Sequence, residues 1–283
     1  MRKSMLGSTG MEVGSVVFGG IICMQEEPKD SDRYVSCAVD NGVNYFDVAP
    51  SYEDSELRLG PSLEPYRKSV YLACKTMERS AKGAAAELES SLKNLRTDYF
   101  DVYQMHAVNT LEEVNAIFAD DGAMQVFIKA RDEGLIRHIG ITSHNAEAAL
   151  AALSLFDFST VLFPVNWALG LGTDFEKTLP GVCAKKQIGL LGMKTLAYRK
   201  WYDDEVHVHP KSWCKIIHND DRFGKCALKY TLSRSAATVV PPGNFDSFMF
   251  CVNNIDECLS NPLGSEDIAF LRDMLPGDDE HIF

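Results

Sequence analysis

The sequence has 283 residues, a length that suits one α/β barrel of roughly 250 residues. Its net charge of −12 argues against a general nucleic-acid-binding protein and against one that binds an anionic membrane surface. The eight cysteines form no CxxC pair, and no apolar run approaches the roughly 18 residues of a membrane span, so we expect a cytoplasmic protein without a zinc or iron–sulfur centre.

Short apolar runs alternate with amphipathic segments along the chain, after a small hairpin that is predicted to turn at residues 8–10. The runs predicted as strands are residues 15–20, 44–48, 69–74, 100–105, 137–142, 160–165, 189–194 and 238–241. The segments predicted as helices are residues 31–42, 55–60, 82–95, 111–133 with a break near Asp121–Gly122, 145–153, 174–187, 223–234 and 246–260.

This alternation predicts a parallel sheet, because each strand is followed by a helix that can carry the chain back to its starting edge. Eight such units without a composition break favour a closed barrel over an open sheet. No GxGxxG motif follows the first predicted strand, which argues against a Rossmann fold. We therefore predict the α/β class, as a single (β/α)8 TIM barrel over residues 1–283 with a short N-terminal β-hairpin.

Reactive side chains follow three consecutive predicted strands. Asp47 ends the second strand, Lys75 ends the third and His106 ends the fourth, while Tyr52 lies in the loop after the second. A barrel collects the carboxyl ends of its strands at one face, so these four side chains should converge on one site.

These four residue types suggest acid–base chemistry. A phenol has a pKa of about 10, and a neighbouring ammonium lowers that pKa by stabilising the phenolate. Asp47 would keep Lys75 charged, and His106 would orient a carbonyl oxygen. Tyr52 would then give a proton to a developing alkoxide, while a bound nicotinamide would supply the hydride.

The motifs that carry these residues resemble the aldo-keto reductase family. LGSTGMEVGSVVFGG resembles the family's opening hairpin and first strand, and NYFDVAPSYEDSELRLG resembles its signature block. LACKT, YQMHA and GLIRHIGITSHN resemble its third, fourth and fifth strands. The resemblance covers nearly the whole chain. It implies a (β/α)8 barrel that binds NADPH, or sometimes NADH, across its mouth, with Asp47, Tyr52, Lys75 and His106 as the catalytic residues.

The resemblance also implies where the cofactor binds and that the substrate is a small carbonyl compound or alcohol. The cofactor-binding residues that it indicates are Gly20, Ile21, Asp47, Thr142, Ser143, Asn166, Met193, Lys194, Leu196, Gly243, Asn244, Phe245 and Asn254. Thr142 and Ser143 would hold the nicotinamide carboxamide, Met193 would lie against the ring, and the residues from Gly243 to Asn254 would bind the adenosine end.

Three positions depart from the family pattern. Pro164 stands where a Gln usually bonds the carboxamide, and Asn166 would project on the same side and substitute for it. Met193 replaces an aromatic ring. The loop PPGNFDSFMFCVNN has no Arg or Lys to pair with a 2′-phosphate, and its Asp246 would repel one. The cofactor therefore stays open between NADP(H) and NAD(H).

Two other functions stay open at this point. One is a nicotinamide-nucleotide-binding sensor or regulatory subunit with little turnover, which the altered cofactor positions motivate. The other is Schiff-base chemistry at Lys75, which Asp47 disfavours by keeping the lysine charged.

The remaining expectations concern metals, the mouth and partners. His207 and His209 are spaced for zinc, but no third ligand has a fixed spacing to them, so we expect no metal. Residues 197–213 are rich in Tyr, Trp and His and are predicted to form a lid on the substrate side. We expect no nucleic-acid or membrane partner, and the sequence leaves open whether the protein is a homo-oligomer.

Overall fold

A computed structural model of the chain describes residues 1–234 and 236–283. Within these residues, the main sheet has eight parallel strands in the order β12-β9-β8-β7-β6-β5-β4-β3. They are β3 (Phe18–Gly19), β4 (Tyr45–Asp47), β5 (Tyr71–Thr76), β6 (Phe100–Met105), β7 (Ile136–Thr142), β8 (Thr160–Pro164), β9 (Gly189–Met193) and β12 (Thr238–Val240).

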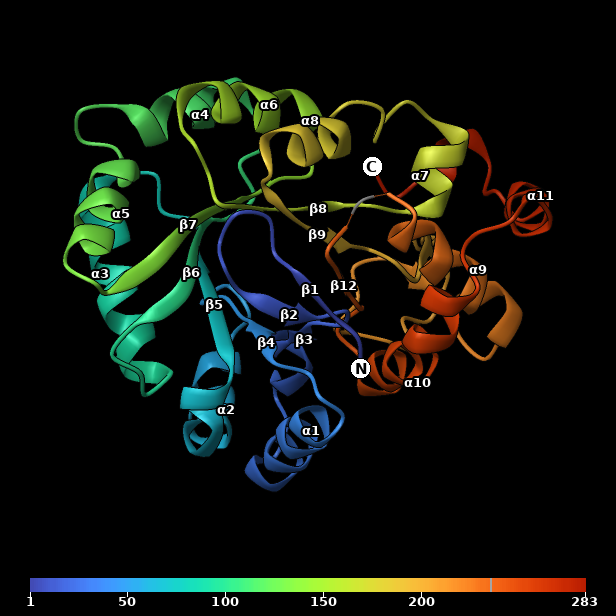
Figure 1. Cartoon of the computed structure of the whole chain (residues 1–283), viewed down its shortest axis with the longest axis horizontal. Coiled ribbons are helices and arrows are strands. Elements are labelled where there is room, and N and C mark those ends of the chain that lie inside the picture. Colours follow the sequence, from blue (N-terminus) through green and yellow to red (C-terminus); the bar gives the residue numbers. More distant parts are fainter. Residues whose placement is uncertain (235) are drawn as a thin grey trace.

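The two ends of this sheet meet. A parallel bridge joins Val16 to Val239, and the Val17 N–H donates a hydrogen bond to the Val239 carbonyl oxygen at 2.9 Å. The strands therefore form a ring, with helices around its outside (Figure 1). This arrangement confirms the predicted (β/α)8 barrel.

The chain begins with an antiparallel hairpin of β1 (Lys3–Met5) and β2 (Glu12–Gly14), as predicted. Gly7 and Gly10 in its turn have φ values of 55° and 75°, which glycine adopts without strain. Leu6 is fully buried against the start of β9, where a Cβ on Gly189 would meet the Leu6 Cγ at 2.6 Å. The hairpin thus covers the end of the barrel at which the strands begin, and it lies across the centre of Figure 1.

Helices surround the barrel, and none among the described residues is both long and apolar enough to cross a membrane. The α-helices are α1 (Pro28–Asp40), α2 (Ser55–Leu63), α3 (Ala81–Asn94), α4 (Leu111–Phe118), α5 (Ala123–Asp132), α6 (Ala146–Leu155), α7 (Trp167–Gly172), α8 (Leu179–Lys186), α9 (Asp221–Leu232), α10 (Phe245–Ser260) and α11 (Ser265–Asp273). The 3-10 turns are η1 (Gly20–Cys23), η2 (Glu64–Ser69) and η3 (Asp278–Glu280).

Most helix predictions are confirmed, with local differences. The break expected near Gly122 separates α4 from α5, and a Cβ on Gly122 would meet the Ile117 carbonyl oxygen at 2.4 Å. The helix predicted at 174–187 begins only at Leu179, because Pro180 fits the first turn of a helix and not its interior. Helices α7 and α11 were not predicted.

The segment predicted as a lid begins with β10 (Ala197–Arg199), which pairs antiparallel with β11 (Lys215–Ile216). We call residues 200–214, between these two strands, the strap. The Arg199 guanidinium pairs with Glu205 near the start of the strap at 2.7 Å. Near its end, the Lys211 ammonium donates a hydrogen bond to the Ile22 carbonyl oxygen at 2.8 Å, so the strap contacts η1, the turn that follows the first strand of the barrel.

Candidate active site

A buried ion pair lies at the carboxyl ends of two neighbouring strands. Lys75 on β5 is fully buried, and its ammonium donates hydrogen bonds to Asp47 Oδ1 on β4 and, at 3.1 Å, to the Val48 carbonyl oxygen. The second oxygen of Asp47 accepts a hydrogen bond from Gln104 Nε2 on β6 at 2.8 Å. Both charges therefore have partners, which a buried ion pair needs if its desolvation is to be offset.

The Asp47 carboxylate keeps Lys75 protonated. Burial by itself would lower the pKa of Lys75, but the negative charge of Asp47 and the Tyr52 phenol outweigh burial and raise it above its ordinary value. A lysine held charged in this way is a poor nucleophile at neutral pH, which argues against Schiff-base chemistry.

Tyr52 lies against this ammonium. The Lys75 Nζ is 4.9 Å from the centre of the Tyr52 ring. Burial raises the pKa of Tyr52 above its ordinary value, the charge of Lys75 opposes that rise, and Asp47 adds to it. Lys75 therefore acts in the expected direction and lowers the pKa of Tyr52, but desolvation of the phenolate is the larger effect, so the net pKa lies above its ordinary value. The phenol is protonated at neutral pH.

His106 faces the phenol from the end of β6. The two ring centres are 6.0 Å apart, with the planes at 89°, and the Ser51 Oγ lies 3.4 Å from His106 Nδ1. Burial, together with the positive charge of Lys75, lowers the pKa of His106 to about 2. The imidazole is therefore neutral at physiological pH, with one ring N–H available as a hydrogen-bond donor.

These side chains share one cavity of about 400 Å³, which we call the reaction cavity. Tyr52, Lys75 and His106 line it together, so the structure places these three predicted residues in one site. Asp47 belongs to the same site because it accepts a hydrogen bond from Lys75. It also lines a smaller adjoining space of about 90 Å³, which we call the central cavity. The convergence expected for these four side chains is thus present.

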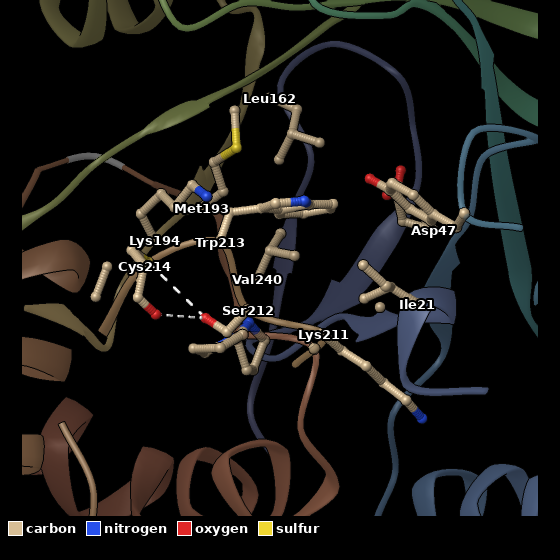
Figure 2. A pocket seen from close by; sticks show the side chains of 16 residues that line it. Ile21, Asp47, Leu162, Met193, Lys194, Lys211, Ser212, Trp213, Cys214 and Val240 are labelled. Carbon is tan, nitrogen blue, oxygen red and sulfur yellow. Dashed lines mark hydrogen bonds between the residues drawn. The ribbon is translucent and has the colours of Figure 1, made fainter. Parts of the chain in front are cut away.

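A third space of about 390 Å³, which we call the outer cavity, adjoins the central cavity but is not lined by Tyr52. The central and outer cavities share Lys211 and Gly243. Figure 2 shows the central cavity between Ile21 and Met193, with the Lys211 side chain extending away from it. We call these three adjoining cavities together the groove. The strap crosses the groove at this point, since a Cβ on Gly243 would meet the Lys211 carbonyl oxygen at 2.7 Å.

Most residues predicted to bind a cofactor lie along these three spaces. Met193 and Lys194, at the end of β9, line both the reaction cavity and the central cavity. Ile21 lines the central cavity, and the buried Gly20 follows β3, where a Cβ would meet Val48 at 2.8 Å. The residues that line the outer cavity from this set are Gly243, Asn244 and Phe245.

Thr142 and Ser143, which were predicted to hold the carboxamide, differ in whether they line the reaction cavity. Thr142 lines the cavity, and its Oγ1 accepts a hydrogen bond from the Ala107 N–H at 2.7 Å. Ser143 is fully buried, and its hydroxyl donates to the Asn145 carbonyl oxygen at 2.8 Å.

Two other predicted residues lie outside these cavities. Leu196 lines a separate space beside α9 and α10. Asn254 lies two to three turns beyond Asn244 on α10, where its side chain donates to the Phe250 carbonyl oxygen at 2.8 Å. The structure brings neither into the groove described above.

Asn166 uses its side-chain amide entirely within the protein. The amide nitrogen donates to the carbonyl oxygens of Lys194 and Ala197 at 2.8 and 2.9 Å. The amide oxygen accepts from the N–H groups of Ala168 and Leu169 and so caps α7. Asn166 is fully buried and supports the turn after β9, so it has no free group with which to replace the Gln of the family pattern.

The structure also brings residues to the groove that the sequence did not indicate. Arg33 and Tyr34 on α1 line the outer cavity, and the Tyr34 ring stacks on Phe245 at 4.1 Å between centres. No local motif marks these two, because α1 precedes Phe245 by more than two hundred residues. Gln104, by contrast, was visible as a polar residue inside the apolar strand FDVYQM.

The histidines of the strap have partners other than a metal. His207 stacks on Trp201 at 4.6 Å, and His209 lies 4.9 Å from His218. Over the described part of the chain, no group of three or more His, Cys, Asp or Glu side chains is arranged to hold a metal ion.

Comparison with known proteins agrees with this barrel. The profile of the Aldo/keto reductase family matches residues 15–243, well over half of the chain. The chain therefore belongs to the aldo-keto reductase family, and the resemblance found in its motifs is confirmed.

Individual relatives are distant. Aldo-keto reductase YhdN of Bacillus subtilis is 29% identical over 185 residues, which cover 59% of this chain and 54% of that protein. L-galactose dehydrogenase of Arabidopsis thaliana is 24% identical over 279 residues, which cover 89% and 85%. The chain spans about half the length of the first curated relatives that it matches.

Solved structures give the same fold. The holo form of aldo-keto reductase AKR11C1 from Bacillus halodurans matches with a TM-score of 0.76 at 20% identity, covering 98% of this chain and 97% of that one. A putative aldo-keto reductase from Pseudomonas matches with a TM-score of 0.73, also at 20% identity, over 91% and 95%. At this identity the likeness concerns the fold alone.

Proposed function

We propose that this protein is an NAD(P)H-dependent oxidoreductase that interconverts a carbonyl group and the corresponding alcohol, with Tyr52 as the general acid and base. The buried Lys75–Asp47 pair beside the Tyr52 ring is the observation that carries the proposal. A charged lysine in a fully buried position is costly to maintain, and family membership makes a role in proton transfer its simplest explanation.

Tyr52 gives a proton to the substrate oxygen during reduction and takes it back during oxidation. Its raised pKa keeps the phenol protonated before reduction, so the proton is present when it is needed. After the transfer, the ammonium of Lys75 compensates the charge of the phenolate. Asp47 holds that ammonium in place and keeps it charged.

His106 orients the carbonyl group. Because its pKa is lowered to about 2, the imidazole is neutral and donates an N–H to the substrate oxygen without bringing a competing acidic proton. The nearby Ser51 hydroxyl, 3.4 Å from Nδ1, favours the tautomer with its proton on Nε2 when it donates to Nδ1.

The groove suits an extended dinucleotide. The nicotinamide end would lie in the central cavity beside Ile21 and Met193, and the adenosine end would lie in the outer cavity beside Asn244 and Phe245. Gly243 leaves the narrow passage between the two, which a Cβ would fill. When bound, the reduced nicotinamide supplies the hydride that adds to the carbonyl carbon.

The choice between NADH and NADPH depends on a charge balance in the outer cavity. Arg33 could pair with a 2′-phosphate, as an arginine does bidentately, but Asp30 already lies 3.3 Å from it. Glu26 and Asp246 line the same space and would repel a phosphate. Both cofactors therefore remain in the proposal.

The first test is nucleotide binding and turnover by the purified protein. We expect NADH or NADPH to bind in a fluorescence titration and to be oxidised in the presence of a carbonyl compound. Tyr52→Phe should lower kcat by about a hundred- to ten-thousand-fold while the nucleotide Kd stays within about twofold.

Tyr103→Phe is the matched control for the loss of one buried hydroxyl. Tyr103 lies on β6 and packs against Phe100 and Phe127, outside the reaction cavity. It should keep the wild-type kcat. Turnover by Tyr52→Phe at the wild-type rate, or a protein that binds neither nucleotide, would refute the proposal.

A second candidate is a nicotinamide-nucleotide-binding sensor or regulatory subunit with little turnover. It is favoured by the side chain of Asn166, whose hydrogen bonds all lie within the protein, so that a contact to the carboxamide is missing at that position. Incubation with reduced nucleotide and a panel of aldehydes, quinones and sugars separates the two functions. Tight binding without turnover of any compound would favour the sensor.

A further inference from the structure

Exposed apolar side chains gather around the reaction cavity. Met77 is 53% exposed, Trp213 69% and Phe283 46%, and all three line this cavity together with the more buried Leu162 and Met193. Single exposed apolar residues are common on protein surfaces. Several around one cavity that also holds reactive groups indicate a surface that is covered when a ligand binds.

Trp213 forms a flat wall opposite the proton donor. Its ring centre lies 6.1 Å from that of Tyr52, with 44° between the planes, and the Lys194 Nζ lies 5.4 Å from the indole. In Figure 2 the indole projects from the strap across the cavity toward Asp47. Trp213 lines both the central and the reaction cavity, so it borders the nicotinamide position as well as the substrate position.

Several polar groups around the same cavity already have partners, and the Lys194 ammonium lies over the rings of Trp213 and Phe283. Lys75 bonds Asp47, the Ser51 hydroxyl lies near His106, and Thr142 Oγ1 accepts from a backbone N–H. Among the described residues that line the cavity, there is no Asp, Glu, Asn or Gln side chain. Carboxylates and amides are the side chains that bond two adjacent hydroxyl groups at once, so most hydroxyls of a buried sugar would lose bonds to water that this cavity does not replace.

The two histidines of the cavity add no charge. The pKa of His106 is about 2, and burial together with the charge of Lys194 lowers the pKa of His144 to about 4. Both rings are neutral at physiological pH, and the His144 ring lies 4.9 Å from Phe283. They extend the flat surfaces around the cavity.

We propose that the substrate is an aldehyde or ketone with a flat, apolar body, such as an aryl aldehyde, and not a sugar, and that Trp213 is the residue that sets this preference. The inference rests on the proposed oxidoreductase function of the same site. In the reduction, the hydride from the nicotinamide forms a bond to the carbonyl carbon as the C=O π bond breaks. The Tyr52 proton goes to the oxygen, so the aldehyde is reduced to an alcohol and the nicotinamide is oxidised.

The test compares substrates that differ in one property at a time. The full chain is assayed with benzaldehyde, with propanal, and with glyceraldehyde, which has the chain length of propanal and two added hydroxyls. In the oxidative direction, benzyl alcohol is compared with an aldohexose. We expect kcat/KM to be about tenfold or more higher for benzaldehyde than for propanal, and lowest for glyceraldehyde and the aldohexose.

Trp213→Ala should lower the ratio of kcat/KM for benzaldehyde to kcat/KM for propanal about tenfold, mainly through the KM for benzaldehyde. The Kd for reduced nucleotide is measured in the same variant, because Trp213 also borders the central cavity. Leu155→Ala is the control, since Leu155 is 57% exposed on α6 and lies outside the cavity. Leu155→Ala should leave kcat/KM unchanged for both benzaldehyde and propanal.

Two results would overturn the inference. One is a kcat/KM for glyceraldehyde or the aldohexose that equals or exceeds that for the aromatic compound. The other is an unchanged ratio of benzaldehyde to propanal in Trp213→Ala. Failure of the proposed oxidoreductase function would give a third result. Propanal needs only the acid–base site, so a protein without this function would leave propanal unreacted as well. The inference about the substrate would then fall together with the proposed function.

Discussion

The two sides of the barrel mouth are built in different ways. At the ends of β4, β5 and β6, the reactive side chains are buried, and Lys75 and Asp47 are 0% and 3% exposed. On the side of the strap, Trp213 is 69% exposed, and Lys211 holds the strap to Glu26 through a partly exposed ion pair. The groups of the proposed proton transfer thus lie on strands fixed by a buried network, and the residue of the proposed recognition lies on a loop fixed by a few surface contacts.

This difference has a physical basis. A buried charge network tolerates few alternative geometries, because displacement of one partner leaves the other uncompensated. A loop on the surface can change its side chains at little cost to stability. Under the proposals above, the same barrel would keep one reaction while the strap determines which compounds reach it.

Lys75→Met attacks the buried side directly and should have the largest effect. It leaves the Asp47 carboxylate buried without its cation, so we expect the free energy of unfolding to fall by about 3–5 kcal/mol. Turnover should fall at least about a hundredfold. Chemical denaturation and steady-state kinetics measure the two effects.

Lys129→Met is the control for Lys75→Met. The Lys129 side chain on α5 is 74% exposed, so its loss should change stability by no more than about 0.5 kcal/mol. A Lys75→Met protein as stable as wild type would mean that the ion pair contributes nothing to the fold.

Glu176 tests how a buried carboxyl group affects the turn after β9. Its carboxylate accepts from the Asn166 N–H and, at 3.3 Å, from the Tyr230 hydroxyl. Burial raises the pKa of Glu176 to about 7, although the bond from Asn166 opposes the rise. Because the pKa is higher in the folded state than in the unfolded state, its contribution is fully present below about pH 4 and is lost as the pH rises through about 7.

The expected result is a pH-dependent difference between wild type and Glu176→Gln. From about pH 4 to pH 8, the free energy of unfolding of wild type should fall by up to about 3 kcal/mol relative to the variant, which lacks the titrating group. Denaturation curves at several pH values measure this difference. Parallel profiles for the two proteins would show that Glu176 does not titrate in this range.

Gly243→Ala tests the passage beneath the strap. Its Cβ would meet the Lys211 carbonyl oxygen at 2.7 Å and the Ile21 Cγ2 at 2.8 Å, so the strap must move. We expect about 1–3 kcal/mol of destabilisation and a rise of about tenfold in the KM for the nucleotide, with kcat less affected. Gly181→Ala is the control, because a Cβ there meets nothing within 4 Å. An unchanged nucleotide KM would place the cofactor elsewhere.

Lys211→Ala should have the smallest effect. The Lys211 and Glu26 side chains are 18% and 27% exposed, so loss of their pair should cost no more than about 1 kcal/mol. The dissociation rate of the nucleotide should rise a few-fold at low salt and less at high salt, because ions screen the pair. Stopped-flow fluorescence measures this dissociation rate. Lys225→Ala is the control. It removes a similar ion pair, between Lys225 on α9 and Glu257 on α10, and should leave the dissociation rate of the nucleotide unchanged.

Most strands of the barrel could be predicted from the sequence. The eight strands lie where apolar runs were found, because a strand that is covered on both faces must be apolar over its length. The errors fell on short elements. Helix α7 has six residues, which is too short for a periodic pattern to reveal it, although Asn166 caps its first turn locally.

The sequence by itself determined the barrel and the meeting of Asp47, Tyr52, Lys75 and His106, because parallel strands necessarily bring their carboxyl ends to one face. Only the tertiary structure decided that burial outweighs Lys75 at the Tyr52 phenol, that the amide of Asn166 supports the turn after β9, and that Trp213 faces the proton donor. Those outcomes depend on desolvation and on contacts between distant segments, which no local pattern of residues records.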